Sequence, residues 1–283
     1  MFCKGDPALL NARSVAIVGS RNASPAGLQI AEEFAEAFVG AGVNVISGLA
    51  LGIDAAAHRG ALRPAATGGA TGASGAAGAS GASTIAIIGT GIDRVYPPRN
   101  RDLAHQIGAQ GAIVSEFGLE TPPLAANFPR RNRLISGLSQ GVLVVEAALG
   151  SGSLITARMA AEQGREVFAI PGSIHSPFSK GCHKLIKEGA KLVETAADVL
   201  EELKWPAGVS VPSGSGSARR DAAAAVGAGD QLLLDALGYD PLSPDEISTR
   251  LGWPIDRVLT SLLQLELGGS LKQSPGGKVQ RVM

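Results

Sequence analysis

The chain has 283 residues, of which 45% are hydrophobic, and its 25 Lys and Arg residues balance its 25 Asp and Glu residues. This composition supports a sizeable core and excludes wholesale disorder, while the zero net charge requires that any nucleic-acid binding come from a local basic patch. We predict a soluble, cytoplasmic protein with no membrane partner. The chain has only two cysteines, far apart in sequence, no apolar run long enough to span a membrane, and no signal-peptide pattern in residues 1–7.

Short apolar runs alternate with amphipathic stretches through the first two thirds of the chain. The runs cover residues 15–18, 43–46, 84–88, 112–114, 142–145 and 167–170, and helical spacing follows in 29–39, 53–62 and 154–163. Strands without polar alternation are buried on both faces. The pattern therefore predicts an α/β fold with a Rossmann-like, doubly wound, mainly parallel sheet, whose ligands lie at the carboxyl ends of the strands.

Composition divides the chain into three parts. We expect a Rossmann-like domain in residues 1–205, a linker in 206–229 and a winged-helix domain in 230–283, with helices at 230–237, 243–251 and 254–267 before a β-wing. Residues 64–83 contain only Ala, Gly, Ser, Thr and Pro, which predicts a flexible surface loop. The segment from Arg219 to Arg281 contains seven basic and eight acidic residues, so we expect the winged helix to contact protein rather than to read DNA.

Three turns at strand ends are suited to anions. Gly19, Ser20 and Arg21 follow the first strand, where exposed amides and a guanidinium grip phosphate. The turn at residues 150–153 follows another strand, with Ser151 beside a predicted helix cap at Ser153, and a third turn lies at 89–91. Each alone is compatible with a purely structural turn. Together along one sheet edge, they predict a site for a polyphosphate or a nucleic-acid backbone.

Residues 128–133 give the strongest local signal. Arg130, Arg131 and Arg133 gather three positive charges in four residues beside Asn132, and Phe128 offers a face for base stacking. The alternative is a solvated charge run. A second basic stripe has helical spacing, with a solvated helix face as its alternative; it comprises Lys180, Lys184, Lys187 and Lys191.

Other patterns carry less chemistry. Residues 137–141 match G-x-S-x-G but lack the preceding strand and following helix of a nucleophile elbow. Asp54 and His58 are four residues apart on a predicted helix, so their side chains can touch. They could form a general-base dyad, but we favour a structural pair on one face of the helix. His175, Cys182 and His183 fall in one predicted loop without a fourth ligand. We therefore expect no metal, no cofactor and no catalytic residue.

Several segments together resemble the DNA-processing protein A (DprA/Smf) family over about residues 1–203. The matching residues are 15–21 (VAIVGSR), 47–54 (SGLALGID) with 57–58 (AH) and 61–62 (AL), 91–97 (GIDRVYP), 128–133 (FPRRNR), 151–157 (SGSLITA) and 171–172 (PG). The resemblance implies a dimeric single-stranded DNA-binding protein of natural transformation that shields incoming strands and loads RecA recombinase. It places Arg21, Arg130, Arg131 and Arg133 along the DNA groove, with Lys180 as an addition. Together with the anion-suited turns and the stacking residue described above, the predicted DNA site comprises Gly19, Ser20, Arg21, Phe128, Arg130, Arg131, Asn132, Arg133, Ser151, Ser153 and Lys180. Relative to the family pattern, the stretch between Leu62 and Thr84 is an insertion.

Two other functions stay open from the sequence. A phosphoribohydrolase-like enzyme would use Glu146, at the end of its strand, as an acid, although the Pro-Gly-Gly-x-Gly-Thr loop of such enzymes is absent. A regulator would bind duplex DNA through the winged helix, against the charge count. For a homodimer, the apolar run at residues 193–203 is the candidate interface.

Overall fold

The computed structural model describes residues 1–63, 81–205, 228–237, 242–268, 270–274 and 277–281. Most of the predicted loop at 64–83 and of the predicted linker at 206–229 lies outside these residues. The chain divides into two compact units, Met1–Ala23 with Ile30–Ser213 and Ser24–Gln29 with Gly214–Met283, and each is described by itself. Within the described part of the chain, no helix has both the length and the apolar character needed to cross a membrane.

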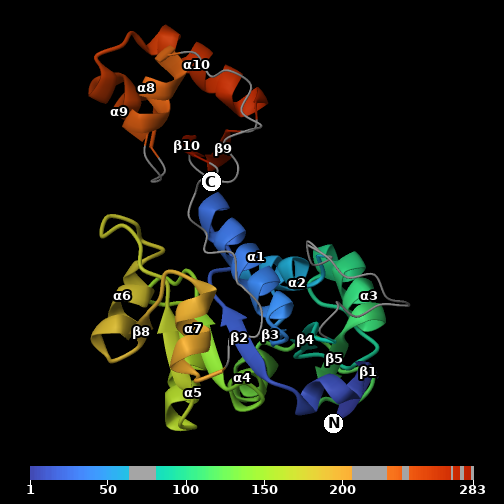
Figure 1. Cartoon of the computed structure of the whole chain (residues 1–283). Coiled ribbons are helices and arrows are strands. Elements are labelled where there is room, and N and C mark those ends of the chain that lie inside the picture. Colours follow the sequence, from blue (N-terminus) through green and yellow to red (C-terminus); the bar gives the residue numbers. More distant parts are fainter. Residues whose placement is uncertain (64–80, 206–227, 238–241, 269, 275–276, 282–283) are drawn as a thin grey trace, which may run out of the picture. The chain divides into compact units, whose positions relative to one another are not determined.

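An eight-stranded sheet forms the centre of the first unit (Figure 1). Its strands are β1 (Phe2–Gly5), β2 (Ser14–Val18), β3 (Asn44–Ser47), β4 (Thr84–Ile87), β5 (Ala112–Ser115), β6 (Gly141–Val144), β7 (Glu166–Ala169) and β8 (Lys191–Leu192). The order is β1-β5-β4-β3-β2-β6-β7-β8, and every neighbouring pair is parallel except β1 with β5. The predicted Rossmann-like, mainly parallel sheet is confirmed. The sequence analysis missed β1, whose four exposed residues carry no buried apolar run.

Helices cover both faces of this sheet. They are α1 (Pro25–Gly40), α2 (Ile53–Ala61), α3 (Arg101–Gln110), α4 (Asn127–Gly137), α5 (Ser153–Glu162), α6 (Lys180–Lys187) and α7 (Ala196–Glu202), with 3-10 turns at Pro7–Asn11 and Pro98–Asn100. Successive residues of a strand point to opposite faces. Ile85 and Ile87 of β4 accordingly pack in one core with residues of α4, α5 and α6, whereas Ala86 and Ile88 pack in another with residues of α2 and α3.

The C-terminal domain is a winged helix, as predicted. It contains α8 (Ala228–Leu237), α9 (Pro244–Leu251) and α10 (Ile255–Leu267), followed by the antiparallel wing of β9 (Leu271–Ser274) and β10 (Lys278–Arg281). The start of α9 is fixed by a capping box: the Glu246 amide donates to Ser243 Oγ at 3.3 Å, and the Ser243 amide donates to Glu246 Oε2 at 2.7 Å. Among the described residues of this domain, ten buried apolar side chains form a core, including Leu233, Ile247 and Val258.

The boundaries of two predicted irregular segments need correction. Helix α8 begins at Ala228, so the last two residues of the predicted linker are helical. At the end of the predicted loop, Ala82 and Ser83 are buried. The Ser83 amide donates to Asn44 Oδ1 at 2.8 Å, and Ser83 Oγ donates to the Gln110 carbonyl at 2.7 Å. Those hydrogen bonds anchor the entry to β4, so the loop ends before Ala82.

Two further predictions fail near the other edge of the sheet. The basic stripe stops at Lys187, where α6 ends, and Lys191 belongs to β8. The apolar run at residues 193–203 does not supply a free dimer face, because Val193, Val199 and Leu200 are buried within the domain.

Candidate nucleic-acid interface

A cavity of about 660 Å³ opens where the strand order of the sheet reverses. Strands β3, β4 and β5 lie on one side of β2, and β6, β7 and β8 lie on the other. The loops after β2 and β6 therefore part here, which is where doubly wound folds bind ligands. We call this cavity the switch-point pocket. Eight of the eleven predicted site residues line it: Gly19, Ser20, Arg21, Phe128, Arg131, Asn132, Ser151 and Ser153.

Arg21 presents an unpaired positive charge to the pocket. Its loop is fixed from within, because the Asn22 amide donates to Ser20 Oγ at 3.2 Å and the Ile53 amide donates to the Ser20 carbonyl at 3.1 Å. The Arg21 side chain is exposed and makes no hydrogen bond or ion pair with any residue that the structure describes. Because the loop backbone is fixed and the guanidinium forms no such contact with the described residues, the Arg21 side chain is available for an anionic ligand.

Arg131 is placed differently from the sequence prediction. Its side chain is buried, with 5% exposure, although one edge reaches the pocket. Nη1 donates to the Gly48 carbonyl at 2.6 Å and to the Ile87 carbonyl, and Nε donates to Asn132 Oδ1 at 3.0 Å. No Cβ would fit at Gly48 beside this guanidinium. Arg131 therefore ties the carboxyl ends of β3 and β4 together under the pocket instead of extending into a groove.

Asp54 holds the same turn from the opposite side. Its Oδ2 accepts from the amides of Gly48 at 3.2 Å and Ala50 at 3.4 Å. Leu49, between them, has a φ of 58°, a left-handed conformation that costs free energy for a branched side chain. Burial raises the pKa of Asp54 while the charge of Arg131 acts to lower it, and burial lowers the pKa of Arg131 to about 10. Asp54 through the Gly48 and Ala50 amides, and Arg131 through the Gly48 carbonyl, thus hold a strained turn at the pocket floor.

His58 does not pair with Asp54, so neither the dyad nor the helix-face pair is correct. Its Nδ1 lies 2.7 Å from Thr84 Oγ1, whose hydroxyl donates to the Val45 carbonyl at 2.9 Å. The imidazole must therefore donate from Nδ1, which leaves Nε2 buried without a partner among the described residues. Burial, with smaller effects of the Arg131 and Arg59 charges, lowers the pKa of His58 to about 3.

An aromatic pair lines another part of the pocket. The rings of Tyr96 and Phe128 lie 5.5 Å apart, and Tyr96 is 44% exposed. Tyr96 falls in the matching segment 91–97 but was not selected as a site residue, although it is one of two tyrosines in a chain with 4% aromatic residues. Phe128 packs on Gly89, where an added Cβ would lie 3.0 Å from the ring. The turn at 89–91 therefore supports an aromatic side chain and does not line the pocket, contrary to its predicted role as an anion site.

The start of α5 supplies hydroxyl groups. Gly152 is the N-cap and Ser153 is the first helical residue, so the predicted capping role of Ser153 is wrong. Its hydroxyl instead forms a hydrogen bond of 2.7 Å with the Ser151 hydroxyl. Both serines line the pocket at the amino end of a ten-residue helix, where the helix dipole favours negative charge.

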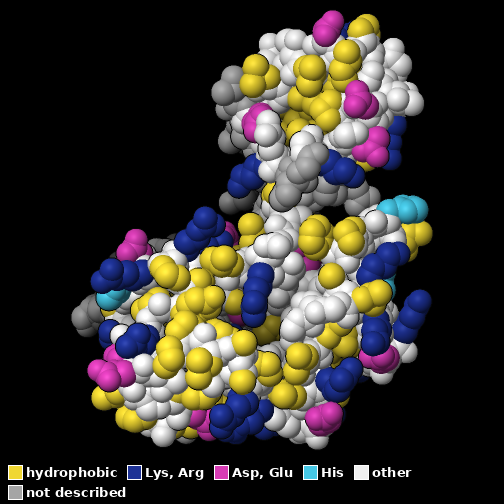
Figure 2. Space-filling model, turned by 180° about the vertical axis from the view of Figure 1, so that it is seen from behind, with side chains coloured by type: hydrophobic (Ala, Val, Ile, Leu, Met, Phe, Trp, Pro, Cys, Tyr) yellow, Lys and Arg dark blue, Asp and Glu magenta, His cyan; other side chains and the backbone are white. Residues whose placement is uncertain are grey.

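Three predicted site residues do not line the switch-point pocket. Arg130 lies over the ring of Phe117 at 5.8 Å, Arg133 forms an ion pair with Glu116, and Lys180 donates to the Ile174 carbonyl. Neighbouring positions on a helix point in different directions, so the three arginines of α4 form no single basic patch. Figure 2 shows one face of the molecule, where dark-blue side chains form several small groups among apolar, polar and acidic ones.

The other candidates from the sequence do not line the switch-point pocket. Ser139 is fully buried and its hydroxyl donates to the Ser136 carbonyl at 3.1 Å, which agrees with rejection of the nucleophile elbow. Cys182 and His183 lie on α6 rather than in a loop, and burial raises the pKa of the Cys182 thiol to about 12. The described residues include no cluster of three potential metal ligands, and Glu146 is half-buried and does not line the pocket.

Comparison with known proteins places these features in a family. A model described as DNA recombination-mediator protein A matches residues 1–204, and one described as DprA winged helix domain matches residues 217–277. Protein Smf of Escherichia coli is 44% identical over 99% of this chain and 71% of its own length. DNA processing protein DprA of Streptococcus pneumoniae is 46% identical over 72% of this chain and 67% of its own.

Two solved structures share the fold. DNA processing protein A of Streptococcus pneumoniae aligns with a TM-score of 0.62 at 46% identity, covering 71% of this chain and 65% of that one. The Helicobacter pylori protein, described by its single-stranded DNA binding mode, aligns with a TM-score of 0.61 at 29% identity, covering 71% and 85%. On the family match over residues 1–204 and these identities, the chain belongs to the DNA recombination-mediator protein A family.

Proposed function

We propose that this chain binds single-stranded DNA in the switch-point pocket. The observation that carries the proposal is the presence in one pocket of two groups of side chains: Arg21, which has no partner among the described residues, with the serine-lined start of α5, and the exposed Tyr96 ring beside the half-buried Phe128. The first group suits a phosphate and the second suits the face of a base. The single-stranded DNA binding of the Helicobacter pylori relative supports the same ligand.

A single strand fits this arrangement better than a duplex. Bases in a duplex are stacked on each other, whereas an unpaired base can turn onto an aromatic side chain. In this proposal Gly19, Ser20, Asn132, Ser151 and Ser153 surround the phosphate or the base, and Arg131 is a positioning residue. Arg130, Arg133 and Lys180 remain candidates for phosphates outside the pocket.

The proposal has four further parts. The protein protects incoming DNA, loads RecA recombinase during natural transformation, forms a homodimer and acts in the cytoplasm. These parts rest on family membership. Loading is measured by the ability of the full chain to start RecA-driven strand exchange on DNA already coated with a single-strand-binding protein. The molar mass of the protein in solution shows whether it forms a dimer.

For the winged helix we propose contact with protein. The exposed side of α10 carries Ile255, Leu259 and Leu263. Its one arginine, Arg257, lies over the ring of Trp253 at 3.9 Å. A helix that reads a duplex presents basic and amide side chains to the groove instead.

The proposed DNA binding is tested by fluorescence anisotropy of a labelled oligothymidine across a salt series, with unlabelled duplex and AMP as competitors. We expect salt-sensitive binding that neither competitor displaces, and weaker binding by Arg21→Ala. Arg158→Ala is the matched control, because Arg158 is exposed on α5 and does not line the pocket. Displacement by AMP would contradict the proposal and direct the work to nucleotide hydrolysis with Glu146 as the acid.

A further inference from the structure

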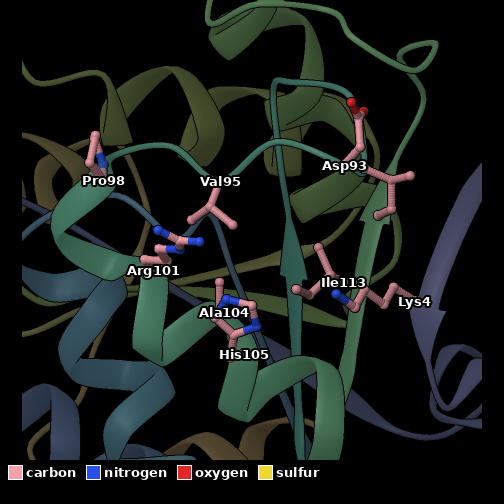
Figure 3. A pocket seen from close by; sticks show the side chains of 9 residues that line it. Lys4, Asp93, Val95, Pro98, Arg101, Ala104, His105 and Ile113 are labelled. Atoms are coloured by element: carbon pink, nitrogen blue, oxygen red, sulfur yellow. The ribbon is translucent and has the colours of Figure 1, made fainter.

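A second cavity, of about 390 Å³, lies near the β1 edge of the sheet (Figure 3). It is bordered by β1, β5, α3 and the loop at residues 92–98, and we call it the edge pocket. Its apolar lining consists of Ile92, Val95, Pro98, Ala104 and Ile113. Such a surface accommodates a flat, poorly hydrated group such as a base.

Three basic side chains surround this apolar lining. Arg101 and His105 are four residues apart on α3 and so share one side of that helix. Lys4 comes from β1, and its stem lies against α3, where a Cβ added at Gly108 would be 3.4 Å from Lys4 Cε. Figure 3 shows Lys4 and Arg101 extending from opposite sides into the cavity, with His105 below Arg101.

None of these three side chains is neutralised from within the chain. Lys4, Arg101 and His105 are exposed, and within the described ranges they form no hydrogen bond or ion pair. The acidic residue of the pocket, Asp93, is already engaged, because its carboxylate accepts from the Glu120 amide at 3.0 and 3.1 Å. It also points away from the basic side chains in Figure 3. An anionic ligand therefore meets Lys4 and Arg101 without a competing internal acid.

The loop at residues 92–98 connects the two pockets. Val95 and Pro98 line the edge pocket, while Tyr96, between them in sequence, lines the switch-point pocket beside Phe128. The exposed Tyr96 ring of the switch-point pocket is thus flanked in sequence by residues of the edge pocket, so that one loop contributes to both pockets.

We infer that the edge pocket binds one nucleotide unit, with its phosphate on Lys4 and Arg101 and its base on the apolar lining. When the unit belongs to a bound strand, this inference rests on the proposed function and makes the edge pocket a second contact for the same DNA. A free nucleotide offers the same chemistry. The two ligands can be distinguished, because the edge pocket adds to the affinity for a strand only when the oligonucleotide is long enough to reach it.

The experiment compares anisotropy titrations of oligothymidines of about 6 and about 20 nucleotides, since single-strand sites span several nucleotides. The variants are Lys4→Met, which keeps the stem over Gly108, and Arg101→Ala. Arg99→Ala is the control, because Arg99 is exposed two residues away and lines neither pocket. Calorimetry with dTMP measures the free nucleotide.

We expect both variants to bind the long strand about five- to tenfold more weakly, as for an exposed charge-assisted contact, and the short strand as the wild type does. The Arg99 control keeps both affinities. Loss of dTMP binding with unchanged strand affinity would assign the pocket to a free nucleotide. Unchanged binding of both the long strand and dTMP would overturn the inference; if Arg21→Ala still weakens the short strand, the proposed function survives that result.

Discussion

The switch-point pocket and the winged helix differ in what their arginines contact. In the pocket, Arg21 has no partner among the described residues, while Arg131 is buried on two backbone carbonyls. In the winged helix, Arg257 lies over Trp253, and Arg250 donates to the Ala236 carbonyl at 3.0 Å. The contacts of each guanidinium, more than the number of arginines in a segment, therefore decide which surface attracts an anion.

The largest expected effect comes from Arg131→Met. Arg131→Met leaves the buried Gly48 and Ile87 carbonyls without their donor and removes the positive charge that acts on Asp54, so we expect a loss of about 3–5 kcal/mol in the free energy of unfolding. Chemical denaturation measures it. Arg130→Met is the neighbouring control on α4 and should change stability by less than about 0.5 kcal/mol. Equal effects of the two variants would show that Arg131 does not hold the pocket floor.

Because His58 is buried in its neutral form, we expect the free energy of unfolding to fall as the pH is lowered. Because burial lowers its pKa to about 3, the folded state favours the neutral ring. This contribution is fully present above the ordinary pKa of about 6.5 and is lost as the pH falls toward 3, with about 2 kcal/mol gone by pH 5. Denaturation curves from pH 7 to 5 should show the loss in the wild type and in the exposed control His175→Gln. In His58→Leu the slope should be flatter; an unchanged slope would assign the acid sensitivity to other groups.

Tyr96→Ala should weaken oligothymidine binding by about 1–2 kcal/mol, the size of one base–aromatic stack. Its exposure means that the free energy of unfolding should change little. Tyr96→Phe keeps the ring and should bind as the wild type does. Anisotropy at fixed salt separates the two variants, and equal weakening by both would mean that the hydroxyl, not stacking, carries the contact.

The smallest effect is expected in the winged helix. Arg257→Ala combined with Lys272→Ala should leave the affinity for duplex DNA unchanged within error, because this domain has no unbalanced positive charge. Competition anisotropy with unlabelled duplex is the measurement. A clear fall in duplex affinity would break the comparison and restore the duplex-binding alternative for this domain.

Much of the fold was predictable because buried parallel strands leave apolar runs such as residues 15–18 and 142–145 in the sequence. The exposed edge strand β1 leaves no such run, and it was missed. In the winged helix, Ser243 and Glu246 marked a helix start through local chemistry alone, and the structure contains that capping box.

The candidate site was predictable only in part, since position along the chain does not give side-chain direction. The arginines of α4 look equivalent in sequence, yet one is buried and two do not line the pocket. Tyr96 was missed because its importance depends on contact with Phe128, more than thirty residues away. Asp54 accepts from backbone amides only six and four residues before it, and this local contact was missed because its spacing from His58 suggested a helix-face pair instead.

The most direct test of the central claim is the salt dependence of oligothymidine binding by the wild type, Arg21→Ala and Arg130→Ala. A phosphate contact on a single strand contributes about −0.7 to the slope of log affinity against log salt. We predict that Arg21→Ala loses about one such contact together with about 1–3 kcal/mol of affinity at low salt, and that Arg130→Ala loses less. Wild-type slope and affinity in Arg21→Ala would contradict the account, because the DNA would then bind away from the switch-point pocket.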